Sequence, residues 1–213
     1  MKHTSASSAV QVVLAAGLSS RMGTSKPLLR FDGRTALQLV LDAGTRGGCE
    51  SAIVVVGHEA ERVRRQHHEF DDRVKWIVND DPGGPQLRSL QLALAAAPLS
   101  FAAFFVHLVD YPLASTKDYC SLLDALKADP DQHTVFIPSI DRRRGHPILC
   151  RWVVAKKLLA LPSDRTARDV INSEAIAYVA TNNAGVTRDM DTPDDYEALL
   201  ALYRSDRGVD EAN

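Results

Sequence analysis

The sequence predicts an α/β fold, because short apolar runs typical of strands alternate with segments whose apolar residues repeat at helical spacing. Strand-like runs rich in β-branched residues occur at 10–14 and 51–56, and between them Leu37, Val40 and Leu41 lie on one face of a predicted helix. No internal repeat and no linker interrupts this alternation. The chain, residues 1–213, is therefore expected to form a single domain with an ordered core at about 9–204.

The remaining elements follow in the same manner along the chain. Further strands are expected at 74–78, 103–109, 134–138 and 148–150. Helices are expected at 35–47, from about residue 59, around 87–94, after a capping box of Ser115 and Asp118, and after a second capping box of Thr192 and Asp195. The last helix turns Tyr196, Leu199, Leu200 and Tyr203 inward, and a polar tail is expected from about Ser205.

Composition and charge argue against several classes of protein. Hydrophobic residues make up 45% of the chain and charged residues 24%, which is typical of a soluble globular domain. A formal net charge of −2 gives no reason to expect nucleic acid or a membrane as a partner. The apolar run at 101–109 is too short to span a bilayer, and the run that ends at Ala16 is expected to be the first strand rather than a secretory signal. Three cysteines without a CxxC motif favour a reducing, cytoplasmic location.

The loop after the first predicted strand carries the strongest functional signal. The strand ends in Ala15-Ala16-Gly17, which have almost no side chains, and Gly23 follows in the turn. Small residues let a backbone approach a ligand closely, and successive N–H groups in a glycine-containing turn bind anions. Arg21 and Lys26 add cations that can contact phosphate oxygens. The loop therefore predicts a nucleoside triphosphate site, although it contains neither a Walker A motif nor a GxGxxG fingerprint.

Carboxylates in two later segments are candidate metal ligands. Ligands of α/β sheets bind beyond the carboxyl ends of the strands, and Asp110 follows the strand expected at 103–109. Asp189 and Asp191 precede the last predicted helix, where Asp191 could instead serve the helix terminus. Because Mg²⁺ is commonly held by one or two carboxylates together with substrate phosphates, we expect it to bind Asp110 and either Asp189 or Asp191.

The loop resembles the signature LAxGxSxRMGxxKxLL of the MobA-like nucleotidyltransferases. The matching residues are Leu14, Ala15, Gly17, Ser19, Arg21, Met22, Gly23, Lys26, Leu28 and Leu29. Further elements of this family have counterparts in the expected order, so the resemblance covers about residues 10–203. They are Asn79 with Gly83, Gly84 and Ser89; Asp110-Tyr111-Pro112; Arg144-Gly145-His146-Pro147; Ala167-Arg168; and the segment from Asp189 to Asp195.

The resemblance implies a Rossmann-like nucleotidyltransferase fold with a mostly parallel central sheet and helices on both faces. It implies nucleotide binding by Leu14, Ala15, Ala16, Gly17, Ser19, Ser20, Arg21, Met22, Gly23, Lys26, Asn79, Gly83, Gly84 and Ser89. It implies acceptor binding by Tyr111, Pro112, Gly145, His146, Pro147 and Arg168. Arg21, Lys26 and Asp110 would be catalytic, with Mg²⁺ held by Asp110 and by Asp189 or Asp191.

Within this family the chain is most similar to the molybdenum cofactor cytidylyltransferases, because Ala16 and the element Arg144–Pro147 match that branch. The implied reaction moves CMP from CTP to a phosphate of molybdopterin or its molybdenum-bound form and releases pyrophosphate. Two alternatives remain open. One is the same transfer to a sugar phosphate or methylerythritol phosphate, and the other is a non-catalytic molybdenum cofactor carrier or maturation protein that serves a recipient molybdoenzyme.

Overall fold

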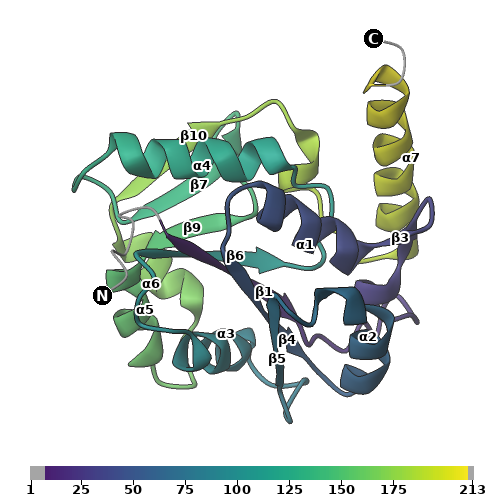
Figure 1. Ribbon diagram of the computed structural model, residues 1–213, viewed down its shortest axis with the longest axis horizontal. Helices are drawn as coiled ribbons and strands as arrows, with labels where there is room; N and C mark the ends of the chain where they lie inside the picture. The colour runs from purple at the N-terminus through teal and green to yellow at the C-terminus, as the bar shows by residue number, and fades with distance from the viewer. Residues whose placement is uncertain (1–7, 211–213) are drawn as a thin grey trace.

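The computed structural model describes residues 8–210, with side chains through residue 206, and contains an eight-stranded central sheet (Figure 1). The strands are β1 (Ala9–Ala15), β4 (Ser51–Val56), β5 (Val74–Val78), β6 (Ala103–Leu108), β7 (Val135–Ile140), β8 (Arg143–Arg144), β9 (Ile148–Arg151) and β10 (Ile176–Ala180). Their order across the sheet is β10-β7-β9-β6-β1-β4-β5, and β8 pairs with β7. A separate hairpin joins β2 (Arg30–Phe31) to β3 (Arg34–Thr35).

The sheet is mostly parallel. β1 pairs in parallel with β4 and β6, and the pairs β4–β5 and β7–β10 are also parallel. Among the strands of residues 8–210, β9 and β8 run antiparallel to their neighbours in this sheet. Leu14 of β1 is level with both Val55 and Leu108, so β1, β4 and β6 end at one edge. The α/β fold with a mostly parallel sheet is confirmed.

Helices cover both faces of the sheet (Figure 1). One face carries α1 (Ala36–Arg46), α2 (Ala60–Gln66) and α4 (Thr116–Ala128), and the other carries α3 (Gln86–Ala96), α5 (Trp152–Leu159) and α6 (Ala167–Ser173). Val12 and Leu14 of β1 pack on the α3 side, whereas Val13 and Ala15 pack on the α1 side. Successive side chains of a strand point to opposite faces of the sheet. A strand that is covered on both faces therefore has a continuous apolar sequence.

The C-terminal helix α7 (Pro193–Asp210) packs on the β2–β3 hairpin instead of the sheet. The ring of Phe31 contacts Tyr196 and Tyr203 edge-on, at centroid distances of 5.5 and 5.7 Å, and Leu199 is buried. The predicted inward face of this helix is therefore confirmed. The helix continues to Asp210 and so includes the first part of the polar tail expected from about Ser205. No helix among residues 8–210 is both long and apolar enough to cross a membrane.

The strand β10, the helices α5 and α6, and the β2–β3 hairpin were not predicted. α5 begins at Trp152, directly after β9 ends at Arg151, so no turn residue marks the boundary. The hairpin turn is Asp32-Gly33, with φ of 45° and 92°, and Asp-Gly is a favoured pair for such turns. Its two-residue strands are too short to show an alternating pattern.

Both predicted capping boxes form at the starts of their helices, and the one made by Ser115 and Asp118 also contacts a distant segment. The Ser115 N–H and hydroxyl donate to Asp118 Oδ2 at 2.8 and 2.7 Å, and Thr192 bonds Asp195 in the same way. Asp118 is 3% exposed and also accepts hydrogen bonds from the Thr181 hydroxyl and the Asn183 amide, both at 2.7 Å. Its carboxylate thereby ties the start of α4 to the segment that follows β10.

Replacing Asp118 with Ala should lower the free energy of unfolding by about 1–3 kcal/mol, because the partly buried donors of Thr181 and Asn183 would lose an acceptor. Chemical denaturation at pH 7 measures this loss. Asp195→Ala is the matched control, since the Asp195 carboxylate accepts hydrogen bonds from Thr192 at the start of its own helix. Equal losses in the two variants would show that Asp118 acts only as a helix cap.

Candidate functional site

The loop after β1 turns back on itself and brings Lys26 to the carboxyl edge of the sheet. The N–H groups of Met22 and Gly23 donate to the carbonyl oxygen of Ser19 at 3.0 and 3.2 Å, and the Ser19 hydroxyl accepts from the Lys26 N–H at 3.2 Å. Gly23 has a φ of 65°, a conformation that glycine adopts without strain. The 3₁₀ turn η1 (Lys26–Leu28), with Pro27 inside it, then sets the starting point of the Lys26 side chain.

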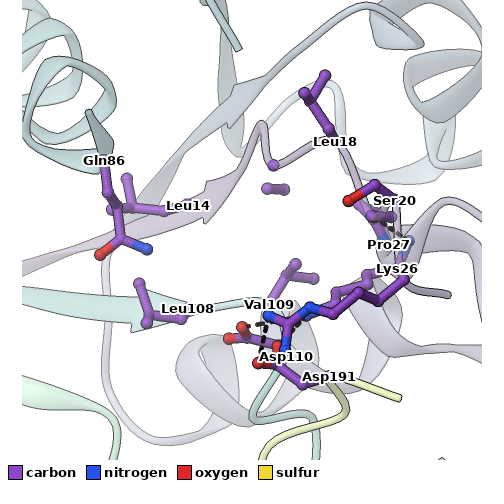
Figure 2. A pocket seen from close by; sticks show the side chains of 14 residues that line it. Leu14, Leu18, Ser20, Lys26, Pro27, Gln86, Leu108, Val109, Asp110 and Asp191 are labelled. Carbon is purple, nitrogen blue, oxygen red and sulfur yellow. Dashed lines mark hydrogen bonds and ion pairs between the residues drawn. The ribbon is translucent and has the colours of Figure 1, made fainter. Parts of the chain in front are cut away.

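Four charged side chains form a cluster beyond this edge, and Figure 2 labels three of them, Lys26, Asp110 and Asp191. Lys26 Nζ is 2.6 Å from Asp191 Oδ1 and 3.4 Å from Asp110 Oδ2, and Arg21 Nη2 is 2.8 Å from Asp191 Oδ2. The hydrogen bond from Lys26, with the charges of Lys26 and Arg21, holds the pKa of Asp191 below its usual value. Asp191 is therefore the carboxylate that neutralises both cations of the loop.

Asp110 differs from Asp191 because one of its carboxylate oxygens is buried. Burial raises the pKa of its carboxyl, although the nearby Lys26 acts in the opposite direction. Its Oδ1 atom is buried without a hydrogen-bond partner, whereas its backbone carbonyl accepts from the Met190 N–H at 2.9 Å. A buried carboxylate oxygen without a partner is costly unless a cation neutralises it.

The residues present fit a divalent cation of the magnesium type. Residues 8–210 contain no group of three or more side chains that could hold a metal alone. Magnesium, however, often takes only one or two carboxylates from the protein and completes its shell with phosphate oxygens and water. The unpartnered Oδ1 of Asp110, with Asp191 beside the same Lys26, suits that mode of binding.

Two adjoining cavities open at this edge. The first has a volume of about 260 Å³ and contains the charged cluster together with small residues of the loop. Its lining residues are Leu14, Ala15, Gly17, Leu18, Ser19, Ser20, Arg21, Lys26, Pro27, Gln86, Leu108, Val109, Asp110 and Asp191. The second has a volume of about 720 Å³ and shares Leu14, Gln86 and Leu108 with the first (Figure 2 shows these three residues).

The second cavity brings together several of the residues predicted to bind an acceptor. Tyr111, Gly145, His146 and Arg168 line it, and the rings of Tyr111 and His146 lie 4.6 Å apart at 36°. A Cβ at Gly145 would lie 2.6 Å from the carbonyl oxygen of Val186, so a side chain does not fit there. Burial lowers the pKa of His146 to about 4, which keeps the ring neutral at pH 7.

Other predicted site residues lie outside both cavities. Ala16 is buried in the core, and Asn79 donates to the buried Ser89 hydroxyl at 2.9 Å. The Asn79 amide oxygen also accepts from the Asp81 N–H at 3.0 Å, so these residues order the loop before α3. The others that line neither cavity are Met22, Gly23, Gly83, Gly84, Pro112, Pro147 and Asp189.

The Asp189 side chain lies next to Tyr111 and not next to Lys26. Burial and the charge of Asp189 raise the pKa of the Tyr111 hydroxyl to about 12, and the carboxylate of Asp189 hydrogen-bonds to it. Among the described residues, the Lys26 ammonium contacts Asp110 and Asp191. Of the two carboxylates left open by the sequence, Asp191 is therefore the one next to Asp110.

Some residues that line the cavities were not predicted from the sequence. Gln86 follows Pro85 at the start of α3 and contacts both cavities, but a single glutamine at a helix start carries no recognisable signal. Arg165 lines the second cavity three residues before Arg168. Its position next to the predicted element Ala167-Arg168 is a signal from which it could have been predicted.

A glycine-containing loop with two cations at the end of a central parallel strand, facing a buried carboxylate, defines an α/β nucleotide-binding protein. A family model described as "MobA-like NTP transferase domain" matches residues 11–179. The chain belongs to this family, as the resemblance in the loop implied. It is accordingly a member of a nucleotidyltransferase family.

Several relatives share this family relationship. The molybdenum cofactor cytidylyltransferase of Escherichia coli is 27% identical over 195 residues, which cover 90% of this chain and 95% of that protein. The probable molybdenum cofactor guanylyltransferase of Rhodopirellula baltica is 34% identical over 158 residues, covering 73% and 72%. Bifunctional protein GlmU of Bifidobacterium animalis subsp. lactis is 33% identical over 146 residues, or 66% of this chain, but the chain spans only 31% of that protein.

Solved structures have a similar fold. Rv0371c from Mycobacterium tuberculosis superposes with a TM-score of 0.80 at 28% identity, covering 91% of this chain and 98% of that one. A complex of Rv0371c with manganese has a TM-score of 0.76 at 26% identity and covers the same shares, 91% and 98%. The nucleotidyl transferase Mth528, at 21% identity and a TM-score of 0.78 over 93% and 98% of the two chains, shares the fold.

Replacing Asp110 with Asn should raise the melting temperature at neutral pH. Burial raises the pKa of this carboxyl, so the ionised form destabilises the folded protein, and the neutral amide removes that cost. The gain should disappear below about pH 4, where the carboxyl is protonated in both the folded and the unfolded protein. Calorimetric melting of both proteins at a series of pH values measures the difference.

Asp191→Asn is the matched control for this measurement. Lys26 and Arg21 lower the pKa of Asp191, so its replacement should reduce the melting temperature at neutral pH. That reduction should fade only as the pH falls through the lowered pKa. A lower melting temperature for Asp110→Asn at pH 7 would contradict the prediction.

Proposed function

We propose that the protein transfers CMP from CTP to a phosphate of molybdopterin, or of its molybdenum-bound form, with release of pyrophosphate. The observation that carries this proposal is the contact between two unlike cavities. The first holds Arg21, Lys26, Asp110 and Asp191, and suits a triphosphate with a metal ion. The second is larger and mostly apolar, carries arginines, and suits a flat heterocycle that bears a phosphate.

Arg21 and Lys26 are the proposed phosphate ligands. Both now contact Asp191, so the oxygens of a triphosphate would compete with that carboxylate for them. Arg21 is mostly exposed and can place two N–H groups on one phosphate, whereas Lys26, with 15% of its side chain exposed, acts as a fixed point charge. We assign Arg21 to the β- and γ-phosphates, which leave together, and Lys26 to the region of the α-phosphate.

Asp110 and Asp191 are the proposed ligands of Mg²⁺, with Asp189 as the alternative to Asp191. Bound Mg²⁺ would supply a Lewis acid that neutralises charge on the phosphates. Support comes from the unpartnered Oδ1 of Asp110 and from the relative that was crystallised with manganese. The contact between Asp189 and Tyr111 favours a different role for Asp189, namely fixing the ring at the entrance to the second cavity.

The acceptor would lie in the second cavity, against the rings of Tyr111 and His146. The Nδ1 atom of His146 is 3.4 Å from the carbonyl oxygen of Val106 and donates toward it, which leaves Nε2 of the neutral ring as a hydrogen-bond acceptor. Arg144 and Arg168 line the same cavity and would bind anionic groups of the acceptor. Because a phosphate monoester is already anionic at pH 7, the reaction depends on positioning and charge neutralisation, without a dedicated base.

The choice of CTP over GTP rests on resemblance and not on the geometry of the site. Ala16, which matches the cytidylyltransferase branch, is buried and lines neither cavity. One relative is named a cytidylyltransferase and another a probable guanylyltransferase. The same transfer to a sugar phosphate or methylerythritol phosphate is the second candidate function, because the charged residues of the first cavity would serve it equally.

Assaying the protein with each of the four NTPs, Mg²⁺ and a panel of acceptors tests the proposal. The panel contains molybdopterin, its molybdenum-bound form, a sugar phosphate and methylerythritol phosphate, and pyrophosphate release is the readout. Transfer to the sugar phosphate alone would replace the proposed acceptor. Binding of the cofactor without transfer to any acceptor would favour the carrier alternative.

In the same assay Asp110→Asn should lower turnover by about 10²–10³-fold, the scale of losing one electrostatic contact to the transition state. Asp194→Asn, a change of an exposed carboxylate in the first turn of α7, is the control and should leave turnover unchanged. Near-normal turnover of Asp110→Asn at saturating Mg²⁺ would show that the metal assignment is wrong.

Tyr111→Ala and His146→Ala should each raise the KM for the acceptor several-fold, since stacking on an aromatic ring contributes about 1 kcal/mol. The KM for the nucleotide should hardly change in either variant. Lys26→Ala provides the contrast, because it should weaken nucleotide binding and spare the acceptor. Steady-state kinetics with one substrate varied at a time measures both constants. A nucleotide KM that rises in the ring variants would place Tyr111 and His146 in the other half of the site.

A further inference from the structure

A buried chain of hydrogen bonds connects α1 to the loop that carries Asp110. His107 on β6 has Nε2 at 2.9 Å from the Tyr111 carbonyl oxygen and Nδ1 at 2.5 Å from the Tyr119 hydroxyl. The Tyr119 oxygen is 2.6 Å from Nε2 of Gln11, and the same nitrogen is 2.8 Å from the Val40 carbonyl oxygen. His107, Tyr119 and Gln11 are each 0% exposed, and none of them lines the two cavities described above.

The two carbonyl groups at the ends set the direction of every bond in this chain. A carbonyl oxygen only accepts, so Nε2 of His107 carries the ring proton and donates it to Tyr111. Burial lowers the pKa of His107 to about 3, so the ring is neutral and Nδ1 accepts from the Tyr119 hydroxyl. The Tyr119 oxygen then accepts from the Gln11 amide, whose second N–H is used by Val40. Each member therefore determines the proton position of the next.

This chain of hydrogen bonds lowers the stability of the core compared with apolar side chains in the same place. Polar groups replace apolar ones between the sheet and two helices, and the Gln11 Oε1 atom is buried without a partner. Gly44 leaves the space that Gln11 occupies, because a Cβ there would lie 2.4 Å from the Gln11 side chain. Buried polar networks that are mostly satisfied specify one local arrangement at the expense of stability.

The far end of the chain is the loop of the proposed catalytic carboxylate. The Tyr111 N–H donates to the Leu108 carbonyl at 3.0 Å, and the Asp110 carbonyl accepts from Met190 at 2.9 Å. With the bond from His107 to the Tyr111 carbonyl, both peptide groups that flank the Cα of Tyr111 are anchored. The anchors set the direction of the Asp110 carboxylate and of the Tyr111 ring.

We propose that His107, fixed in its Nε2–H form by Tyr119 and Gln11, is a positioning residue that holds the Asp110–Tyr111 loop in its reactive arrangement. This inference rests on the proposed function for its kinetic consequence. Its structural content, an ordered loop held by one ring proton, does not depend on which nucleotide or acceptor is used.

Two conservative variants separate positioning from packing. In His107→Gln the amide N–H can lie near the position of Nε2 and keep the bond to Tyr111, whereas in His107→Asn the shorter side chain reaches only the position of Nδ1 and can keep the bond to Tyr119. Each variant loses one hydrogen bond, so both should melt at similarly lowered temperatures. His107→Asn should lower kcat by about tenfold or more, whereas His107→Gln should stay within about threefold of the parent protein. The KM for the nucleotide should change little in either.

Leu126→Ala is the control for a general loss of stability. Leu126 is buried in the same apolar cluster as Tyr119, but its side chain makes no hydrogen bond. Its truncation should therefore lower the melting temperature and leave kcat intact. A kcat that follows the melting temperature across all three variants would overturn the proposal, because the role of His107 would then be structural only.

Two measurements test the proposal without catalysis. The ¹⁵N resonances of the imidazole should show the Nε2–H tautomer in the parent protein, and amide hydrogen exchange at residues 109–111 should be faster in His107→Asn than in His107→Gln. An Nδ1–H tautomer, or equal exchange in the two variants, would overturn the inference whatever the enzyme does. A parent protein that transfers no nucleotide would instead overturn the proposed function, and the exchange comparison would still decide the role of His107.

Discussion

The ion pairs of Asp191 with Lys26 and Arg21 join parts of the chain that are 165 and 170 residues apart. Exposed ion pairs contribute little, but Lys26 is mostly buried, and a buried cation without a partner is strongly destabilising. The loop after β1 and the segment before α7 are therefore held at one edge of the sheet. The geometry of the first cavity depends on this contact, since three of its four charged residues take part in it.

The two carboxylates that face Lys26 are in opposite electrostatic situations. Asp191 is partly exposed and its pKa is lowered by two cations, whereas burial raises the pKa of Asp110 and leaves one of its oxygens without a partner. A site optimised for stability would not retain such an oxygen. Natural sites often keep groups of this kind where a ligand needs them, at some cost to the stability of the fold.

One antiparallel strand explains how the second cavity is joined to the first. β9 enters the sheet between β6 and β7 in the reverse direction, so its first residue, Ile148, is level with Val106 near the end of β6. The turn that precedes β9 therefore lies at the carboxyl edge and sets His146 against Tyr111. In a fully parallel arrangement the start of this strand would lie at the opposite edge, far from the loop of Asp110.

Local sequence signals by themselves determined most of the alternation of strands and helices up to β9, both capping boxes, the inward face of α7, and a loop specific enough to indicate the family. These depend on residues a few positions apart, which is why they can be read without a structure. Only the tertiary structure decided that Asp191 and not Asp189 contacts Lys26, that Asn79 and Ser89 bond each other outside the cavities, and that His107 reaches the Tyr111 carbonyl. The roles of the site residues in binding and catalysis stay predictions. Contacts between segments up to 170 residues apart depend on how helices and strands pack, and no local pattern records that packing.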